Sequence, residues 1–184
     1  MFIQTEETPN PAALKFLPGR AVLETGVADF TNRDAAQRSP LARLLFEIEG
    51  VEGVFLATEF ITVTKAADKH WQVLKPMVLG AIMDHFTAGV PVMEAGESAS
   101  EAADAGQDDE VVSQIKELLE TRVRPAVAQD GGDIIYKGFK NGTVYLHLRG
   151  SCAGCPSSTA TLKMGIENML RHYVPEVLQV EAIA

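Results

Sequence analysis

The sequence predicts an α+β protein of two small domains joined by an acidic, flexible linker. Residues 94–110 read EAGESASEAADAGQDDE, with seven acidic residues and no Lys or Arg. This stretch has nothing bulky to bury, so we expect it to be solvated and disordered. On both sides of it, apolar stripes at helical spacing alternate with short β-rich runs. Residues 1–93 and 111–184 are each long enough for a small domain.

The composition limits the kinds of partner. The chain has a net charge of −9 and 46% hydrophobic residues. An acidic protein lacks the basic footprint that binding to nucleic acid or an anionic membrane requires, so we expect neither as a partner. No run of about 18 apolar residues predicts a membrane span. The first residues, MFIQTEETPNPAALKF, lack the features of a secretion signal or an organelle transit peptide.

The first domain begins with two expected short strands, at residues 15–17 and 21–23, around a Pro-Gly turn. Ser39 and Pro40 then fit the N-cap and first position of a helix. Its apolar stripe ends at Gly50 and consists of Leu41, Leu44, Leu45 and Ile48.

Two β-rich runs, residues 54–57 and 60–64, follow around a short turn. A second helix should end near Gly89, with Pro76 marking either a kink or its true start. Its apolar face consists of Trp71, Leu74, Val78, Ile82 and Phe86. We interpret Trp71, the single tryptophan, as a core residue.

The second domain opens with a helix in which Pro125 should produce a kink or an end. Its stripe consists of Val111, Ile115, Leu118, Leu119, Arg122 and Val123. The sequence DGGD at residues 130–133 is a turn signal at a helix-to-strand junction, where glycine adopts positive φ at low cost. Alternatively, the two glycines form a smooth patch where a partner backbone approaches.

A hairpin comes next, because the Asn-Gly pair at residues 141–142 separates two alternating runs, 134–139 and 143–148. The second run leads directly into GSCAGC at residues 150–155. Pro156 then opens a helix whose buried stripe is Leu162, Ile166, Met169, Leu170 and Tyr173. A last strand at residues 177–183 completes the order α-β-β-α-β.

The chemistry lies in Cys152 and Cys155, the only cysteines. Two cysteines are too few for a disulfide framework, and their spacing suits a metal or redox site in a reducing compartment. A following helix N-terminus favours thiolates, and the CxxC spacing lets both sulfurs reach one metal centre. Zinc and iron–sulfur clusters need about four ligands. None of the four histidines is an evident ligand, so a twofold-related pair of chains is the simplest way to complete the site.

The stretch from Val112 to Glu181, with RVRPAVAQDGGDIIYKGF and GSCAGCPSS, resembles the C-terminal domain of NifU, the Nfu domain. TEETPNPAALKFLPGRAV and FITVTK resemble the N-terminal domain of Nfu proteins. The resemblance implies an iron–sulfur cluster scaffold or carrier, not an enzyme. Such a protein holds a 4Fe–4S cluster between two protomers, with Cys152 and Cys155 as ligands. It receives help from upstream assembly factors and passes the cluster to recipient apoproteins.

Two other readings of the CxxC pair stay open at this point. One is a thiol–disulfide redox protein, since a dithiol at a helix N-terminus also suits redox chemistry. The other is a zinc-bridged structural dimer, because four thiolates accept zinc as well as a cluster. For the compartment, we expect the cytoplasm of a bacterium, or the mitochondrial matrix if the chain is a processed form.

Overall fold

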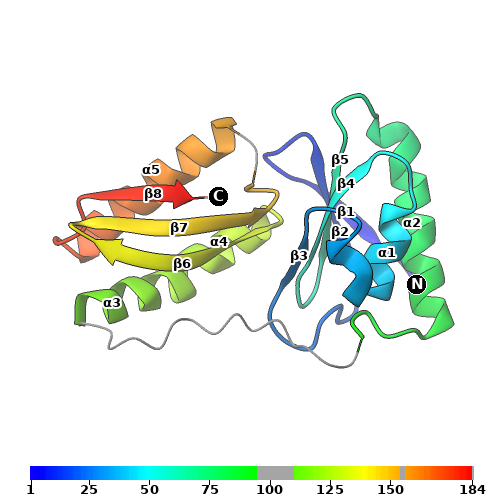
Figure 1. Cartoon of the computed structure of the whole chain (residues 1–184), viewed down its shortest axis with the longest axis horizontal. Helices are drawn as coiled ribbons and strands as arrows, with labels where there is room; N and C mark the ends of the chain where they lie inside the picture. The colour runs from blue at the N-terminus through cyan, green and yellow to red at the C-terminus, as the bar shows by residue number, and fades with distance from the viewer. Residues whose placement is uncertain (95–109, 154–155, 184) are drawn as a thin grey trace. The chain divides into compact units, whose positions relative to one another are not determined.

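The computed structural model describes residues 1–94, 110–153 and 156–183, the side chains of 156–158 excepted. It divides into two compact units, Met1–Ser100 and Glu101–Ala184, each of which mixes helices and strands (Figure 1). The predicted α+β class is therefore confirmed, while the predicted disorder of residues 94–110 lies almost wholly outside the described residues. In the described part of the chain, no helix is both long and apolar enough to cross a bilayer.

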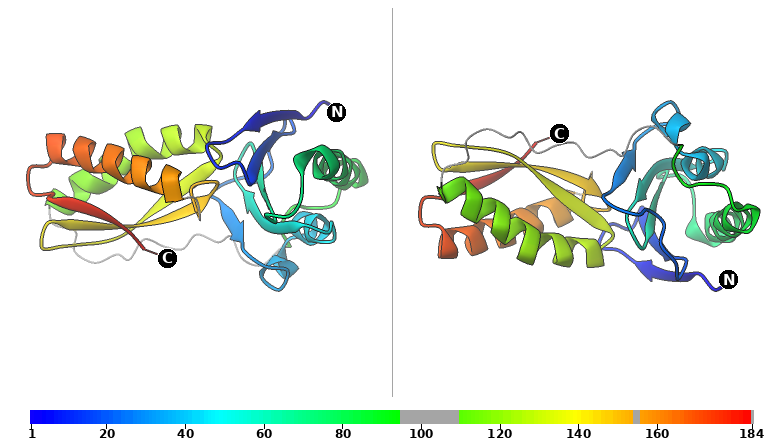
Figure 2. Two further views of the ribbon diagram at one scale, coloured as in Figure 1. Left: turned by 90° about the horizontal axis from the view of Figure 1, so that it is seen from above. Right: turned by 90° about the horizontal axis from the view of Figure 1, so that it is seen from below.

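The first unit is a five-stranded antiparallel sheet in the order β1-β2-β5-β4-β3. Two helices cover the same face of this sheet (Figure 2). Large apolar side chains from both layers, among them Phe16, Phe30, Leu41 and Ile82, are fully buried between them. The elements are β1 (Gln4–Glu7), β2 (Ala13–Leu17), β3 (Ala28–Phe30), η1 (Ala35–Arg38), α1 (Pro40–Phe46), β4 (Val51–Leu56), β5 (Ile61–Lys65) and α2 (Trp71–Ala88).

The predicted start of α1 is confirmed. Ser39 is the N-cap, and its Oγ accepts a hydrogen bond of 3.1 Å from the Ala42 amide. The same Oγ donates to the Val92 carbonyl at 2.6 Å, so a wholly buried residue ties α1 to the end of the unit. The two predicted β-rich runs pair as the hairpin of β4 and β5.

The predicted strand at residues 21–23 is wrong. Val22 is buried, and its amide makes one hydrogen bond of 2.8 Å to the Thr58 carbonyl, without a strand ladder. Its apolar pattern therefore reflects burial of a loop. The prediction also missed β1 and β3, which are short edge strands with little alternation.

Helix α2 runs through Pro76 and ends at Gly89, which caps it with a left-handed φ of 68°. The predicted end is thus confirmed, and Pro76 is not the start. Trp71 lies in the first turn and packs edge-on against Phe16, with ring centroids 6.3 Å apart. Its Nε1 donates to the Pro11 carbonyl at 3.2 Å, so the indole sits at the border of the core.

The second unit is a three-stranded sheet in the order β6-β7-β8 with its helices on one face (Figure 2). Strands β6 and β7 are antiparallel, and β8 returns parallel to β7 after α5. The predicted order α-β-β-α-β is confirmed. The elements are α3 (Glu110–Leu118), the π-helical segment η2 (Leu119–Val123), α4 (Arg124–Gln129), β6 (Gly132–Lys140), β7 (Thr143–Gly150), α5 (Pro156–Tyr173) and β8 (Gln179–Ile183).

Pro125 neither ends nor breaks the first helix of this unit. The Arg124 amide donates to the Leu119 carbonyl, five residues back, which is the π-helical pattern. This wider turn comes immediately before the proline and leads into α4, where Pro125 occupies an N-terminal position at which its missing N–H is tolerated.

The turn between β6 and β7 confirms the Asn-Gly prediction, because Asn141 and Gly142 both have positive φ, 52° and 79°. One position of the predicted α5 stripe is wrong. Tyr173 is 47% exposed, and its ring lies 5.0 Å from the Arg122 guanidinium. Tyr173 has the spacing of a core residue, but its ring packs against the Arg122 side chain at the surface.

Candidate cysteine site

The DGGD sequence forms the turn between α4 and β6, and its two glycines are needed for different reasons. Gly131 has a φ of 79°, the left-handed value that closes a helix, and its amide donates to the Ala128 carbonyl at 3.0 Å. Gly132 begins β6 opposite Gly150 at the end of β7. Punctuation of the chain therefore accounts for Gly131 alone.

Gly132 lies directly against the cysteine loop. A Cβ atom at this position would be 2.5 Å from Cys152 Sγ and 2.8 Å from the Arg149 carbonyl oxygen. No side chain fits there without displacing one of them. What approaches Gly132 is the loop of the same chain that carries Cys152. The smooth patch for a partner backbone stays a prediction.

Ser151 fastens the loop to the DGGD turn. Its hydroxyl donates to the Asp130 carbonyl, and its amide donates to the Gly131 carbonyl at 3.3 Å. On the other side, Thr159 of α5 donates its hydroxyl to the Cys152 carbonyl at 3.2 Å. Ser151 and Cys152 are only 2% and 6% exposed, so the first cysteine is held by backbone contacts and sheltered from solvent.

The structure places one of the two predicted ligands. Cys152 lies between β7 and α5, four residues before Pro156, as the sequence predicts. Cys155 lies outside the described residues. Among the described residues, no three His, Cys, Asp or Glu side chains gather in a way that could hold a metal ion. The described part of one chain therefore offers Cys152 but no complete ligand set around it.

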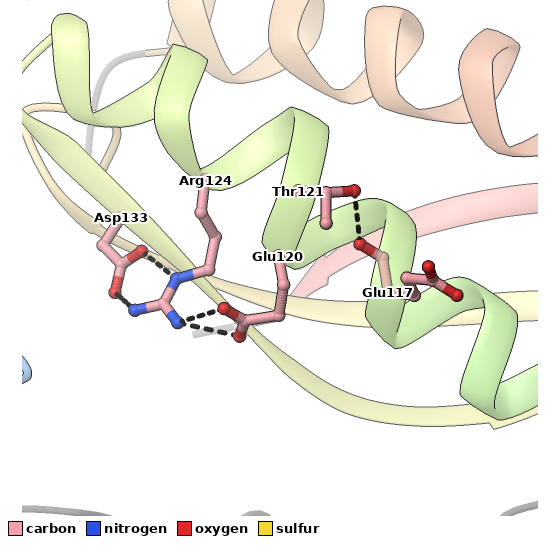
Figure 3. Close-up of polar contacts among 5 residues, drawn as sticks. All are labelled: Glu117, Glu120, Thr121, Arg124 and Asp133. Carbon is pink, nitrogen blue, oxygen red and sulfur yellow. Dashed lines mark hydrogen bonds and ion pairs between the residues drawn. The ribbon is translucent and has the colours of Figure 1, made fainter.

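A network that the sequence analysis missed stands beside the turn (Figure 3). Arg124 donates through Nε and Nη2 to the two carboxylate oxygens of Asp133, at 2.9 and 3.1 Å. Its Nη1 donates to both carboxylate oxygens of Glu120, at 2.8 and 3.0 Å. Asp133 is 4% exposed. The hydrogen bond to Asp133 raises the pKa of the Arg124 guanidinium, which keeps the cation charged at every relevant pH.

Only a weak sequence signal points to this network. Glu120 and Arg124 have the (i, i+4) spacing of a helical ion pair, which is common on exposed helices. The more informative residue is Asp133, an acidic residue at a strand start where the neighbouring positions are buried. A buried carboxylate needs a cation, and Arg124 is the cation that Asp133 contacts.

A CxxC pair in the sequence, whose first cysteine lies on a strand-to-helix loop of a small α+β domain, defines a class of thiolate-based metal or redox sites. The particular family follows from comparison with known proteins. Residues 3–89 match the family "Scaffold protein Nfu/NifU N terminal", and residues 115–181 match the NifU-like domain. The chain belongs to the Nfu family of iron–sulfur cluster scaffold proteins.

The relatives from human and from Arabidopsis thaliana agree with this assignment. The human protein "NFU1 iron-sulfur cluster scaffold homolog, mitochondrial" is 56% identical over 184 residues, which are 100% of this chain and 72% of the human one. "NifU-like protein 4, mitochondrial" of Arabidopsis thaliana is 52% identical over 98% of this chain and 65% of its own length. A solution NMR structure of a NifU-like protein from Saccharomyces cerevisiae has 26% identity and a TM-score of 0.47, and covers 52% of this chain and 87% of that one. The chain thus spans roughly two thirds to three quarters of the human and plant relatives' length.

Proposed function

We propose that this protein is a carrier that holds a 4Fe–4S cluster between two protomers and transfers it to recipient apoproteins. The cluster is the cargo, and Cys152 and Cys155 of each protomer supply its four thiolates. The observation that carries the proposal is the CxxC pair in the sequence, whose first cysteine lies on a strand-to-helix loop, in a chain whose family scaffolds iron–sulfur clusters. The proposal needs a homodimer, because one chain contains only two cysteines.

The position of the loop, before a helix N-terminus, suits the negative charge of a site that holds a cluster. Four thiolates and a core of charge 2+ total about −2, and clusters are stabilised by N–H groups that donate to their sulfurs. The N-terminus of α5, which has 18 residues, follows the cysteines and supplies a partial positive charge from each protomer. Both effects also favour the thiolate over the thiol before loading.

Transfer proceeds by ligand exchange, in which thiolates of the recipient replace the four carrier thiolates in turn. The carrier itself makes and breaks no bond of a substrate molecule, so we propose a non-enzymatic role. Its partners on this proposal are upstream assembly factors that deliver the cluster and apoproteins that accept it. A nucleic acid or a membrane has no part in this reaction.

The decisive experiment measures iron, acid-labile sulfide and zinc per chain on anaerobically purified protein, together with its mass in solution. The proposal predicts about two irons and two sulfides per chain in a dimer, which amount to one shared cluster. Cys152→Ser and Cys155→Ser should each lose the cluster and the dimer while circular dichroism reports an intact fold. The matched control is Ser113→Ala, a small change on the exposed face of α3.

Two outcomes would replace the proposal by one of its alternatives. Zinc at about half an equivalent per chain in a dimer would indicate a structural site of four thiolates. A metal-free monomer whose two thiols titrate as one disulfide would indicate a redox protein. A Cys152→Ser variant that keeps a full cluster would contradict the assignment of the ligands.

For the domains, we propose the division into residues 1–93, a linker of 94–110, and residues 111–184. The first domain selects recipients or restrains the second until a partner binds. Transfer rates to several apoproteins, measured with and without residues 1–93, test this role. Equal rates for every recipient would exclude both versions.

For the compartment, we propose the mitochondrial matrix. The names of the human and Arabidopsis relatives, both mitochondrial, favour it. The cytoplasm of a bacterium, the other expectation, has no support of this kind. Fractionation of the source cells, with the protein detected by antibody, tests the assignment, and recovery outside mitochondria would contradict it.

A further inference from the structure

We propose that Arg124 is a positioning residue for Cys152. It fixes Asp133, and through Asp133 it fixes the backbone of Gly132 against which the Cys152 thiol packs. This inference rests on the proposed function for its purpose, namely to hold a cluster ligand in place. The contacts themselves belong to the chain without its cargo, so they are testable even if the cargo is misassigned.

The first step is the geometry of the guanidinium. Arg124 makes two parallel hydrogen bonds to Asp133 and two more to Glu120 (Figure 3). The planar fork holds Asp133 by two parallel donors while its third nitrogen contacts Glu120, so a lysine at this position would keep the charge and lose the parallel pair. Glu120 and Arg124 belong to the helix, whereas Asp133 belongs to β6, so the fork joins the two elements.

The second step is the short path from Asp133 to the thiol. Asp133 follows Gly132 in the chain and is buried, so it cannot shift without moving the strand start. Gly132 has no free space toward Cys152 Sγ, while Ser151 ties the other side of the loop to Asp130 and Gly131. Any displacement of Asp133 therefore changes the space in which the Cys152 thiol packs against Gly132.

The third step separates positioning from general stability. A buried ion pair contributes little net stability, since desolvation offsets most of its attraction, and apolar pairs of similar volume replace such pairs without loss. What an ion pair does supply is a fixed geometry. The π-helical segment Leu119–Val123, which directly precedes Arg124, is of a rare type found often at functional sites.

The test measures how fast iodoacetamide alkylates Cys152 in the full-length, metal-free, reduced protein. A Cys155→Ser background leaves Cys152 as the single thiol. Arg124→Lys and Arg124→Gln should each raise the alkylation rate by at least about tenfold. A fall of about 1.4 kcal/mol in the free energy of local opening makes the open, reactive form of the loop ten times more populated. Arg124→Lys keeps the positive charge, so faster alkylation in this variant reports a change of geometry and not the loss of a cation.

The matched control is Arg122→Gln, an arginine two residues away whose guanidinium lies over the Tyr173 ring. It should leave the alkylation rate within about twofold of the parent. Urea unfolding of every variant gives the population of globally unfolded chain and hence the alkylation that global unfolding alone produces. Positioning predicts rates above that value for the Arg124 variants.

The double variant Arg124→Met, Asp133→Leu completes the design. It removes both charges and should recover global stability, yet the Cys152 thiol should stay at least about fivefold more reactive than the parent because the fork is gone. Rates that follow global unfolding in every variant, or that stay unchanged in Arg124→Lys, would overturn the proposal. A wild-type chain that binds no cluster would overturn the proposed function and leave this result untouched.

Discussion

Replacing Gly132 by alanine tests the closest approach in the site. The added Cβ would lie 2.5 Å from Cys152 Sγ, 3.2 Å from Cys152 Cβ and 2.8 Å from the Arg149 carbonyl oxygen. Favourable contacts between carbon atoms need about 3.5–4.0 Å, so all three are overlaps. The thiol can rotate, but the carbonyl belongs to β7 and is fixed by the pairing of that strand with β6.

The magnitude follows from two opposing effects. Overpacking of a tight site costs about 1–3 kcal/mol, whereas replacing a strand glycine by alanine recovers about 0.5–1 kcal/mol of chain entropy. Because a backbone atom is involved, we expect a net loss of about 2 kcal/mol from the free energy of unfolding of the second unit. For a unit of this size, that lowers Tm by roughly 10 °C.

The assay uses the fact that the single tryptophan, Trp71, belongs to the first unit. Trp71 fluorescence follows urea unfolding of that unit, and far-UV circular dichroism follows both units. Gly132→Ala should leave the fluorescence transition in place. In the dichroism curve it should shift only the transition that comes from the second unit.

Gly138→Ala is the matched control. Gly138 lies in the same strand without a positive φ, and a Cβ there meets no atom within 4 Å. It should be neutral or slightly stabilising. If the free energies of unfolding of the second unit in Gly132→Ala and Gly138→Ala differ by less than about 0.5 kcal/mol, Cys152 does not pack on Gly132 in solution and the reasoning fails.

Three further predictions probe the two units separately. Ser39→Ala should lower the unfolding free energy seen by fluorescence by about 1–2 kcal/mol, since one hydroxyl both caps α1 and bonds Val92; an unchanged midpoint would contradict this. Burial lowers the pKa of His85 from its ordinary 6.5, so the unfolded chain binds the proton more readily. The stability of the first unit should thus be full above pH 6.5, fall as the pH drops below it, and lose that dependence in His85→Leu. Ile115→Ala should cost the second unit about 2–5 kcal/mol, and Met164→Ala, at a residue 65% exposed, should change it by less than about 0.5 kcal/mol; equal losses would refute the assignment of the core.

Local chemistry made much of the second unit predictable. Asn141-Gly142 demanded a two-residue turn, and the structure gives both residues positive φ. Pro156 marked the start of α5 because its fixed φ and missing N–H suit a first helical position. These signals act within a few residues and need no knowledge of the rest of the fold.

The Gly132–Cys152 contact was not predictable in the same way. Gly132 and Cys152 are 20 positions apart in the sequence, and their contact depends on how β6 and β7 pair. The same holds for Arg124, whose partner Asp133 lies on another element. For Pro125, the sequence predicted a kink or an end. The helix does not end there, and a π-helical turn that the sequence did not predict precedes the proline.

The pairing register explains why one irregularity far from the cysteines matters to them. Near the turn, Lys140 pairs with Thr143 and Gly138 with Tyr145. Continued without change, that register would place Gly132 opposite Ser151. The bulge between Tyr136 and Gly138 shifts it by one residue.

The shifted register places Gly132 opposite Gly150 and Asp133 opposite Arg149. The Asp133 carboxylate meets the Arg124 fork in this arrangement, and the Cys152 thiol lies over a residue that has no side chain. A slip of one residue sends every side chain of a strand to the opposite face, so it would turn the Asp133 carboxylate away from Arg124. The bulge therefore sets the pairing register at the cysteine site, although its nearest residue, Gly138, is 14 positions from Cys152 in the sequence.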